Sequence, residues 1–275
     1  MFDLVLHGAD TFVGTGPSYP WGGLYGGQIV AQALRAASNT VDDGMDVHSL
    51  RAYYIRRGDA AEPVRYEVDR IRNGRSFATR RVVARQAVGA ILNLEASYQH
   101  DEESAVVDAI VMPSIPRPDS LEESSWSSDF ERCFVPESAT PPSAPYGTGR
   151  IMAWIRVTPP LPDPAIREGA LLHRCWLAYL SDDLPCDSVV RAHPRRAELE
   201  ADESRFMASL DHTIWFHRTP HADRWHLYDV STHHFGAGRG VTIGHVFDAE
   251  GVLLATFAQE ALLREDMTPR ADRTQ

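Results

Sequence analysis

Histidine is the most conspicuous potential metal ligand in this sequence, and its histidines cluster in the second half, among them His212, His217, His233 and His234. Imidazole nitrogens are common zinc ligands, but the spacing of these residues argues against a metal site. His212 and His217 are five positions apart, so in a continuous strand they point to opposite faces, and adjacent His233 and His234 do the same. We therefore expect no metal ion, and no cofactor.

A single amide near the C-terminus gives a second chemical signal. Leu253, Ala255, Phe257 and Gln259 alternate along a predicted strand and therefore share one of its faces. The Gln259 amide continues an apolar row, and a buried amide must find hydrogen-bond partners. Two interpretations stay open: a structural network that holds the core, or an amide that orients a water molecule.

Composition argues against several kinds of chemistry. All 27 basic residues are arginine, which excludes Schiff-base catalysis and a Walker-type phosphate lysine. The chain has no Gly-x-Ser-x-Gly elbow, so we do not expect a nucleophilic serine with a histidine base. A phosphate-bearing ligand would have to be held by arginine, backbone N–H groups or helix N-termini. The net charge of −11 argues against nucleic acid as a partner.

Cysteine usage and hydropathy bear on the compartment. Cys133, Cys175 and Cys186 form neither a disulfide framework nor a paired Cys-x-x-Cys motif, which is typical of a reducing cytoplasm. No apolar run approaches the ~20 residues that a membrane helix needs, and the first residues show no secretory signal. We therefore expect a cytoplasmic protein without stable membrane insertion.

The elements that would position these side chains recur in the two halves of the chain. Each half is predicted to hold one long apolar helix, after Gly26 and Gly27 in the first half and after Gly169 in the second. The two helical stripes comprise Ile29, Val30, Ala33, Leu34 and Ala37, and then Leu171, Leu172, Cys175, Trp176, Tyr179 and Leu180. An antiparallel meander follows each helix, with a hairpin turn at Asn73-Gly74 in the first.

Residues 48–99 and 208–261 read as rough copies of each other. Their similar opening phrases contain Ser49 and Ser209, and the turn glycines Gly89 and Gly251 precede their last strands. A duplication of this length indicates the architecture. An apolar helix must bury its stripe, and a curved sheet offers the surface. We predict an α+β double hotdog: two tandem repeats, each with a long helix wrapped by a curved antiparallel sheet, with the sheets paired edge to edge.

The predicted division of the chain has four parts. Residues 1–100 form the N-terminal hotdog, 101–149 a linker, 150–265 the C-terminal hotdog and 266–275 a tail. The linker is rich in proline, serine and glutamate and has no sustained period, so we expect it to cross the surface from one half to the other. Residues 193–205 are predicted to be a charged, solvated insert in the second hotdog.

With these elements in place, the sequence resembles the type II acyl-CoA thioesterases, double-hotdog enzymes of bacteria and peroxisomes. The resemblance spans both halves and is weakest in the linker and the insert. The matching phrases, in order, are Gly26-Gly27-Gln28, His48-Ser49-Leu50, Arg57-Gly58-Asp59, Arg72-Asn73-Gly74-Arg75-Ser76-Phe77, Leu210-Asp211-His212, Trp215-Phe216-His217, Arg239-Gly240 and Gln259-Glu260.

The resemblance implies a catalytic trio of Asp182, Ser209 and Gln259. Asp183 adjoins Asp182 and stays open as the alternative acid. We hypothesise that the trio holds a water molecule, with the aspartate as general base, and that this water attacks the thioester carbonyl without a covalent intermediate. The substrate would be a fatty acyl-CoA, and the products the free fatty acid and CoA.

The start of the first helix is the candidate substrate-binding segment. Gly26, Gly27 and Gln28 would place backbone N–H donors where an oxyanion develops, because a helix N-terminus leaves such groups unpaired.

The two copies differ where the chemistry is expected. Ser97 stands at the position that corresponds to Gln259, and residues 38–40 offer no acid equivalent to Asp182. We therefore expect one active site per chain, in the second half.

Two alternative functions stay open. The chain could be a non-catalytic hotdog protein that binds acyl-CoA or another lipid. A hotdog enoyl-CoA hydratase is the less favoured alternative, because no paired Asp/His constellation supports it. By analogy with the family, we expect a homodimer or a tetramer.

Overall fold

The computed structural model describes residues 1–140, 149–202 and 205–264. Its first half contains one helix and a meander of long strands. The elements are β1 (Leu4–Leu6), β2 (Thr11–Gly14), α1 (Gly26–Ser38), β3 (Met45–Tyr54), β4 (Val64–Asn73), β5 (Phe77–Gln86) and β6 (Gly89–His100).

The second half repeats this order and adds several short elements. All elements of this half are, in order, η1 (Pro118–Ser120), β7 (Phe130–Phe134), η2 (Glu137–Ala139), β8 (Ile151–Val157), α2 (Arg167–Leu180), α3 (Pro185–Ala192), α4 (Arg196–Ala201), β9 (Phe206–Ser209), β10 (Asp211–Phe216), β11 (His226–Gly236), β12 (Arg239–Phe247) and β13 (Leu253–Arg264).

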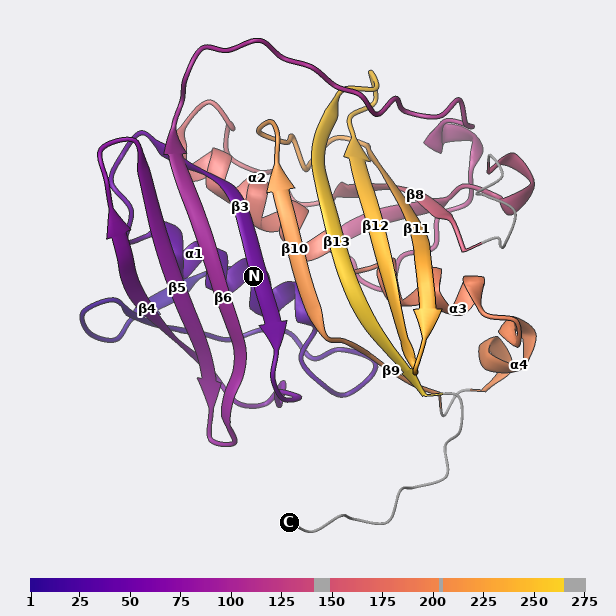
Figure 1. The fold of residues 1–275 in the computed structure, drawn as a ribbon, viewed down its shortest axis with the longest axis horizontal. Helices are drawn as coiled ribbons and strands as arrows, with labels where there is room; N and C mark the ends of the chain where they lie inside the picture. Colours follow the sequence, from indigo (N-terminus) through magenta and orange to yellow (C-terminus); the bar gives the residue numbers. More distant parts are fainter. Residues whose placement is uncertain (141–148, 203–204, 265–275) are drawn as a thin grey trace.

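The strands of both halves join in one antiparallel sheet (Figure 1). The order is β1-β2-β4-β5-β6-β3-β10-β13-β12-β11-β8-β7, and β9 pairs with β13. The halves meet where β3 pairs with β10, with Leu50 opposite Ile214 and Ala52 opposite His212. This pairing satisfies backbone groups that would otherwise form two open edges. The predicted α+β double hotdog, with its sheets joined edge to edge, is confirmed.

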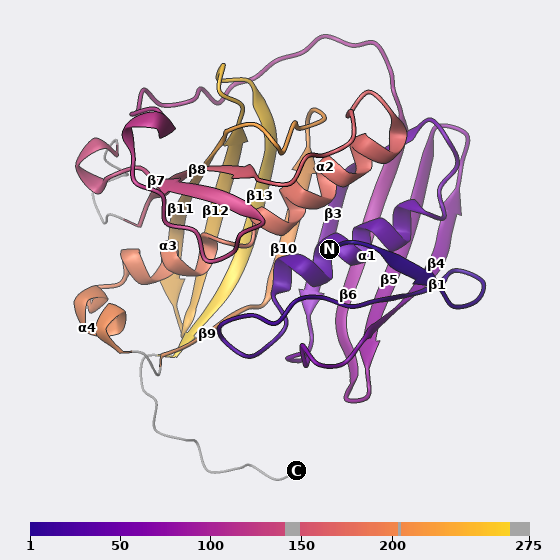
Figure 2. The same cartoon turned by 180° about the vertical axis from the view of Figure 1, so that it is seen from behind.

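Both long helices cover the same face of the sheet (Figure 2). The predicted stripe of α1 is buried, and Val30, Ala33 and Leu34 have no exposed surface. The first turn of α1 packs directly on the last turn of α2. A Cβ on Gly27 would lie 2.2 Å from the carbonyl oxygen of Tyr179, so only glycine permits this approach.

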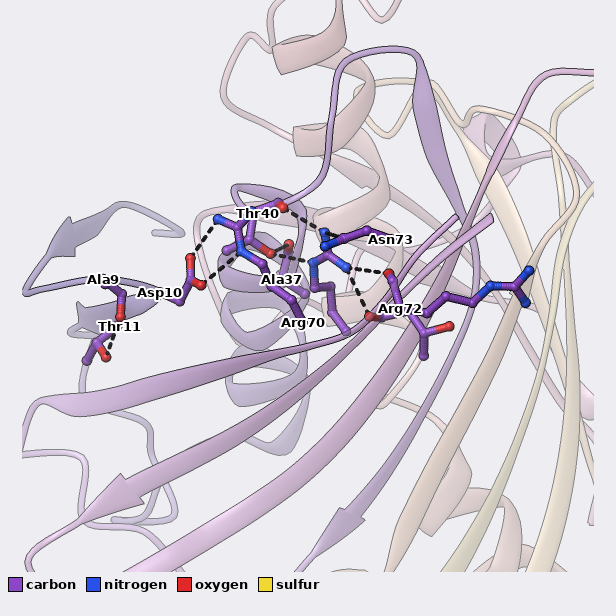
Figure 3. A network of polar contacts seen from close by, with 10 residues as sticks. Ala9, Asp10, Thr11, Ala37, Thr40, Arg70, Arg72 and Asn73 are labelled. Atoms are coloured by element: carbon purple, nitrogen blue, oxygen red, sulfur yellow. Dashed lines mark hydrogen bonds and ion pairs between the residues drawn. The ribbon is translucent and has the colours of Figure 1, made fainter. Parts of the chain in front are cut away.

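A buried arginine fixes the other end of α1 to the sheet. Arg80 in β5 is 1% exposed. Its guanidinium donates to Thr40 Oγ1 and O at 2.7 and 2.8 Å, to Asn73 Oδ1 at 2.7 Å and to Arg72 O at 2.9 Å. Thr40 Oγ1 in turn donates to the carbonyl oxygen of Ala37 in α1 (Figure 3). The hairpin after β4 therefore supplies acceptors that hold a cation at the C-terminal end of α1, where it is favoured.

The linker and the insert contain more structure than the sequence indicates. Residues that follow β6 cross to the second half (Figure 1), but β7 then adds a strand to β8, and Phe130 is 1% exposed. The five-residue pattern of β7 is too short to stand out among prolines and serines. The insert contains α4, which buries Leu199 against Val189 and its neighbours. The domain limits stay predictions, and the tail at 266–275 lies outside the described residues.

We expect Arg80→Met to lower the free energy of unfolding by about 3 kcal/mol, because it leaves buried acceptors without a donor. The measurement is urea unfolding followed by circular dichroism. Arg81→Met is the matched control, since Arg81 is half exposed and pairs with Asp69 on the surface. This control should cost less than about 1 kcal/mol. Equal losses for the two variants would contradict the anchoring role of Arg80.

Candidate active site

The structure brings the three predicted side chains together. Asp182 follows the C-terminal turn of α2, Ser209 ends β9, and Gln259 lies in the middle of β13. Ser209 Oγ donates to Asp182 Oδ1 at 2.9 Å, and Gln259 Nε2 donates to Ser209 Oγ at 2.7 Å. Asp182 is 7% exposed and Gln259 1%. A buried carboxylate, a half-buried hydroxyl and a buried amide thus form one polar cluster in the second half.

The adjacent carboxylates have separate partners. Asp183 accepts a hydrogen bond from Trp126 Nε1 at 2.6 Å and forms an ion pair with Arg132 at 2.5 Å. Both side chains of this ion pair are nearly buried. Asp183 is therefore occupied by a structural contact with the linker, whereas Asp182 is the carboxylate that faces Ser209.

The first turn of α1 lies beside Asp182, so the cluster has walls from both halves of the chain. The Gly27 N–H lies toward the Asp182 carboxylate and lowers its pKa. A Cβ on Gly26 would lie 2.5 Å from Asp182 Oδ2 and 2.9 Å from the Tyr54 hydroxyl. The sequence places the trio in the second half, but α1 and β3 of the first half complete its surroundings. Gln28 is directed elsewhere, since its Oε1 accepts a hydrogen bond from Tyr19 at 2.6 Å.

Burial and hydrogen bonds act in opposite directions on Asp182. Desolvation raises the pKa of this carboxyl from 3.8 to about 6, and the neighbouring Asp183 charge adds to the increase. Donors from Ser209, Gln259 and the Gly27 backbone lower the pKa by stabilising the ionised form. The result is a carboxylate that is ionised at neutral pH and more basic than an exposed aspartate, as a general base requires.

His212 joins this cluster, although the sequence had marked it only as a potential metal ligand and as part of a family phrase, with no role in the site. Its Nδ1 lies 2.6 Å from Gln259 Oε1, and its Nε2 lies 2.8 Å from Ser181 Oγ. Burial lowers its pKa to about 4, so the ring is neutral. His212, Ile214 and Phe216 alternate on the buried face of β10. That alternation is the sequence signal that could have marked His212 as a core residue.

Among the described residues, the three other histidines weighed as metal ligands and the acid Asp211 form no hydrogen bond with the predicted trio. His217, His233 and His234 are exposed. In the part of the chain that the structure describes, no three His, Cys, Asp or Glu side chains gather in an arrangement that could hold a metal ion. Asp211 Oδ1 accepts a hydrogen bond from the Glu260 N–H at 2.7 Å, which shapes the junction between β9, β10 and β13.

Tyr54 is a second residue of the site that the sequence did not single out. It ends β3, next to the seam, and its backbone N–H donates to the Leu210 carbonyl oxygen at 3.0 Å. Its hydroxyl is buried without a hydrogen-bond partner among the described residues. The pKa of this hydroxyl is raised well above 10, first by burial and then by the Asp182 charge, so it is protonated and can donate.

Comparisons with known proteins agree in both halves of the chain. Residues 15–99 match the family model of the acyl-CoA thioesterase N-terminal domain, and residues 107–263 match that of the C-terminal domain. Acyl-coenzyme A thioesterase 8 of Mus musculus is 34% identical over 266 residues, which covers 88% of this chain and 80% of that protein. Acyl-CoA thioesterase 2 of Haemophilus influenzae is 29% identical, covering 88% and 87%.

Solved structures give the same result. The acyl-CoA thioesterase II TesB2 of Mycobacterium marinum is 34% identical, with a TM-score of 0.83 over 98% of each chain. A hot dog fold protein of Alicyclobacillus acidocaldarius, 20% identical with a TM-score of 0.76, supports the fold alone. The two matching domain models and the extent of these similarities show that the chain belongs to the acyl-CoA thioesterase family.

Proposed function

We propose that this protein hydrolyses fatty acyl-CoA to the free fatty acid and CoA, and that a water molecule activated by Asp182 attacks the thioester carbonyl. The observation that carries the proposal is the hydrogen-bonded cluster of Asp182, Ser209 and Gln259, buried beside the first turn of α1. Membership of the acyl-CoA thioesterase family supports thioester cleavage as the reaction.

In this mechanism the ionised Asp182 takes a proton from the water as its oxygen attacks the carbonyl carbon. Ser209 and Gln259 hold the carboxylate and help to orient the water. The tetrahedral oxyanion then expels the CoA sulfur, and the protonated Asp182 returns its proton to the departing thiolate. The carboxyl ends the cycle ionised, and the products are a carboxylic acid and a free thiol.

Backbone N–H groups at the start of α1 are the proposed donors to the oxyanion. No side chain caps this helix, because Tyr25 at the N-cap makes no side-chain capping bond. The Gly27 N–H already contacts Asp182, which leaves the N–H groups of Gly26 and Gln28 as donors at the positive end of the helix. Such donors act where negative charge develops.

A covalent cysteine mechanism has little physical support. Cys186 lies near Ser209 and Asp182, but burial and the two neighbouring carboxylates, Asp182 and Asp187, raise its pKa far above neutrality. The thiol therefore stays protonated, and a thiolate is the form that acts as a nucleophile.

The alternative functions make different measurable predictions. A non-catalytic acyl-CoA or lipid-binding protein would bind an acyl-CoA in stoichiometric amount without releasing thiol. An enoyl-CoA hydratase would add water to a double bond and leave the thioester intact. A series of acyl-CoAs of graded chain length, assayed for free thiol, separates these outcomes and also gives the chain-length preference.

We also propose a cytoplasmic location and a homodimeric or tetrameric assembly. Cys133, Cys175 and Cys186 are free thiols, which agrees with a reducing compartment. No helix among the described residues is long and apolar enough to cross a membrane. Light scattering on the purified protein measures the assembly, and a monomer would contradict that part of the proposal.

Asp182→Asn should reduce thiol release by about 10²–10⁴-fold, because an amide cannot accept the proton of the water. Folding should be retained, since the substitution removes a buried charge that desolvation disfavours. Asp183→Asn is the matched control. It breaks the buried ion pair with Arg132 and should lower Tm while turnover per folded molecule stays within a few-fold of wild type. Near-normal turnover of Asp182→Asn would exclude Asp182 as the base.

The pH profile of kcat/KM should have an acidic limb near pH 6. Protonated Asp182 cannot act as a base, so activity is complete above its pKa of about 6 and falls about tenfold per pH unit below it. Asp183→Asn should move this limb to lower pH, because the Asp183 charge contributes to the raised pKa of Asp182. A limb at or below pH 4, the range of an ordinary aspartate, would be inconsistent with this role.

Two glycine substitutions in α1 should separate the site from the packing. In Gly26→Ala the new methyl meets the ends of the Asp182 and Tyr54 side chains. We expect these side chains to move, with a loss of kcat on the order of 10²-fold and a small change in Tm. In Gly27→Ala the methyl meets the Tyr179 backbone, which cannot move as freely, so a large fall in Tm is expected. Thiol-release kinetics and thermal unfolding of both variants give the comparison, and the reverse order of effects would refute it.

A further inference from the structure

The catalytic cluster is the end of a longer chain of hydrogen bonds. Five side chains are linked in order: Ser181, His212, Gln259, Ser209 and Asp182. The joining distances are 2.8 Å from Ser181 Oγ to His212 Nε2, 2.6 Å from His212 Nδ1 to Gln259 Oε1, 2.7 Å from Gln259 Nε2 to Ser209 Oγ and 2.9 Å from Ser209 Oγ to Asp182 Oδ1. The chain thus returns to the residue next to its starting point.

The direction of every proton in this chain follows from its Asp182 end. An ionised carboxylate only accepts hydrogen bonds, so the Ser209 hydroxyl must donate to Asp182. Because Ser209 has one proton, its oxygen must accept from the next residue, and Gln259 must present its NH2 group. The Gln259 carbonyl oxygen then faces His212, which must carry its proton on Nδ1. The neutral ring leaves Nε2 as an acceptor, and the single Ser181 hydroxyl proton is shared between Nε2 at 2.8 Å and the Ala178 carbonyl oxygen at 3.0 Å.

We propose that His212 is a positioning residue for the hydrolysis proposed above, and that its Nδ1–H tautomer fixes the orientation of the Gln259 amide. Through that amide it fixes the Ser209 hydroxyl on Asp182. An amide can rotate by half a turn with little change in shape. Its oxygen would then face Ser209 and compete with Asp182 for one hydroxyl proton, and Asp182 would lose donors that hold it in place.

The surroundings of His212 keep the ring in one place. The side chain has no exposed surface, and its ring lies 5.9 Å from the ring of Phe257, centroid to centroid. His212 lies opposite Ala52 in the β3–β10 pair, so the seam between the two halves fixes its backbone. At the far end, Ser181 follows α2 directly, and its hydroxyl also donates to the carbonyl oxygen of Ala178 at 3.0 Å, which holds the serine side chain against the helix.

Substitutions that keep one ring nitrogen position or the other test the proposal. An asparagine amide reaches about as far as Nδ1, and a glutamine amide about as far as Nε2. We expect His212→Gln and His212→Leu to lower kcat on the order of 10²-fold with KM little changed, because the amide of Gln259 is released. His212→Asn should recover most of that loss, since it returns an N–H donor to Gln259 Oε1.

A purely structural role predicts a different order. Glutamine is closer to histidine in volume than asparagine is, so packing alone would make His212→Gln the better replacement in both Tm and kcat. Thermal unfolding of all three variants and turnover per folded molecule separate the two cases. Equal kcat for the asparagine and glutamine variants, or a higher kcat for glutamine, would overturn the proposal.

A second measurement reads the tautomer directly in the unmodified protein. Nitrogen-15 NMR of histidine-labelled protein distinguishes Nδ1–H from Nε2–H rings, and the signal missing from His212→Asn identifies His212 among the 12 histidines. The proposal requires Nδ1–H at pH 8, and an Nε2–H ring would refute it. This result does not depend on turnover. If no acyl-CoA releases thiol, the proposed function fails, while the tautomer still decides whether His212 orients Gln259.

Discussion

The contact between the first turn of α1 and the last turn of α2 determines the rest of the site. It exists because position 27 has no Cβ, which lets the helix backbones meet at Tyr179, and the Tyr25 hydroxyl adds a hydrogen bond to the Tyr179 carbonyl oxygen at 2.8 Å. The helix ends that meet carry opposite partial charges. Asp182, placed just after the negative end of its own helix, thereby lies beside the positive end of another.

This arrangement balances two opposing demands on the carboxylate. It must be dry enough to be more basic than an exposed aspartate, and it must stay ionised at neutral pH. Burial supplies the first condition, while donors from Ser209, Gln259 and Gly27 supply the second. Neither helix nor strand alone provides these donors, because they come from α1, β9 and β13. The fold therefore has to be complete before Asp182 acquires its properties.

Local patterns in the sequence were sufficient for the architecture, whereas the trio came from the resemblance to the thioesterase family. The stripe of α1 and the alternation in each meander can be read from a short window, and so can the position of Gln259 in an apolar row. The site residues that could not be predicted from the sequence depend on contacts between distant segments. His212 and Tyr54 look like ordinary strand residues until β3 and β10 are paired, and neither residue's partners lie nearby in the chain.

Two short elements, β7 and α4, were not predicted from the sequence for a different reason. β7 has five residues and lies within a segment rich in proline and serine, so its alternation is brief. Leu199 is one apolar side chain in a charged helix, and a helical period cannot be recognised from one residue. In both cases burial comes from the sheet or from α3 rather than from a property of the segment itself.

The β3–β10 pair also makes the two halves a single unit. A break in the crossing segment after His100 would leave two pieces, each with one unpaired strand edge, on β3 in the first piece and on β10 in the second. The second piece would retain Asp182, Ser209 and Gln259 but lose the amide of Gly27 that contacts the carboxylate. Separately produced halves would therefore have to pair β3 with β10 again before the first turn of α1 could lie beside Asp182, and until then each would expose an edge that can pair with other chains.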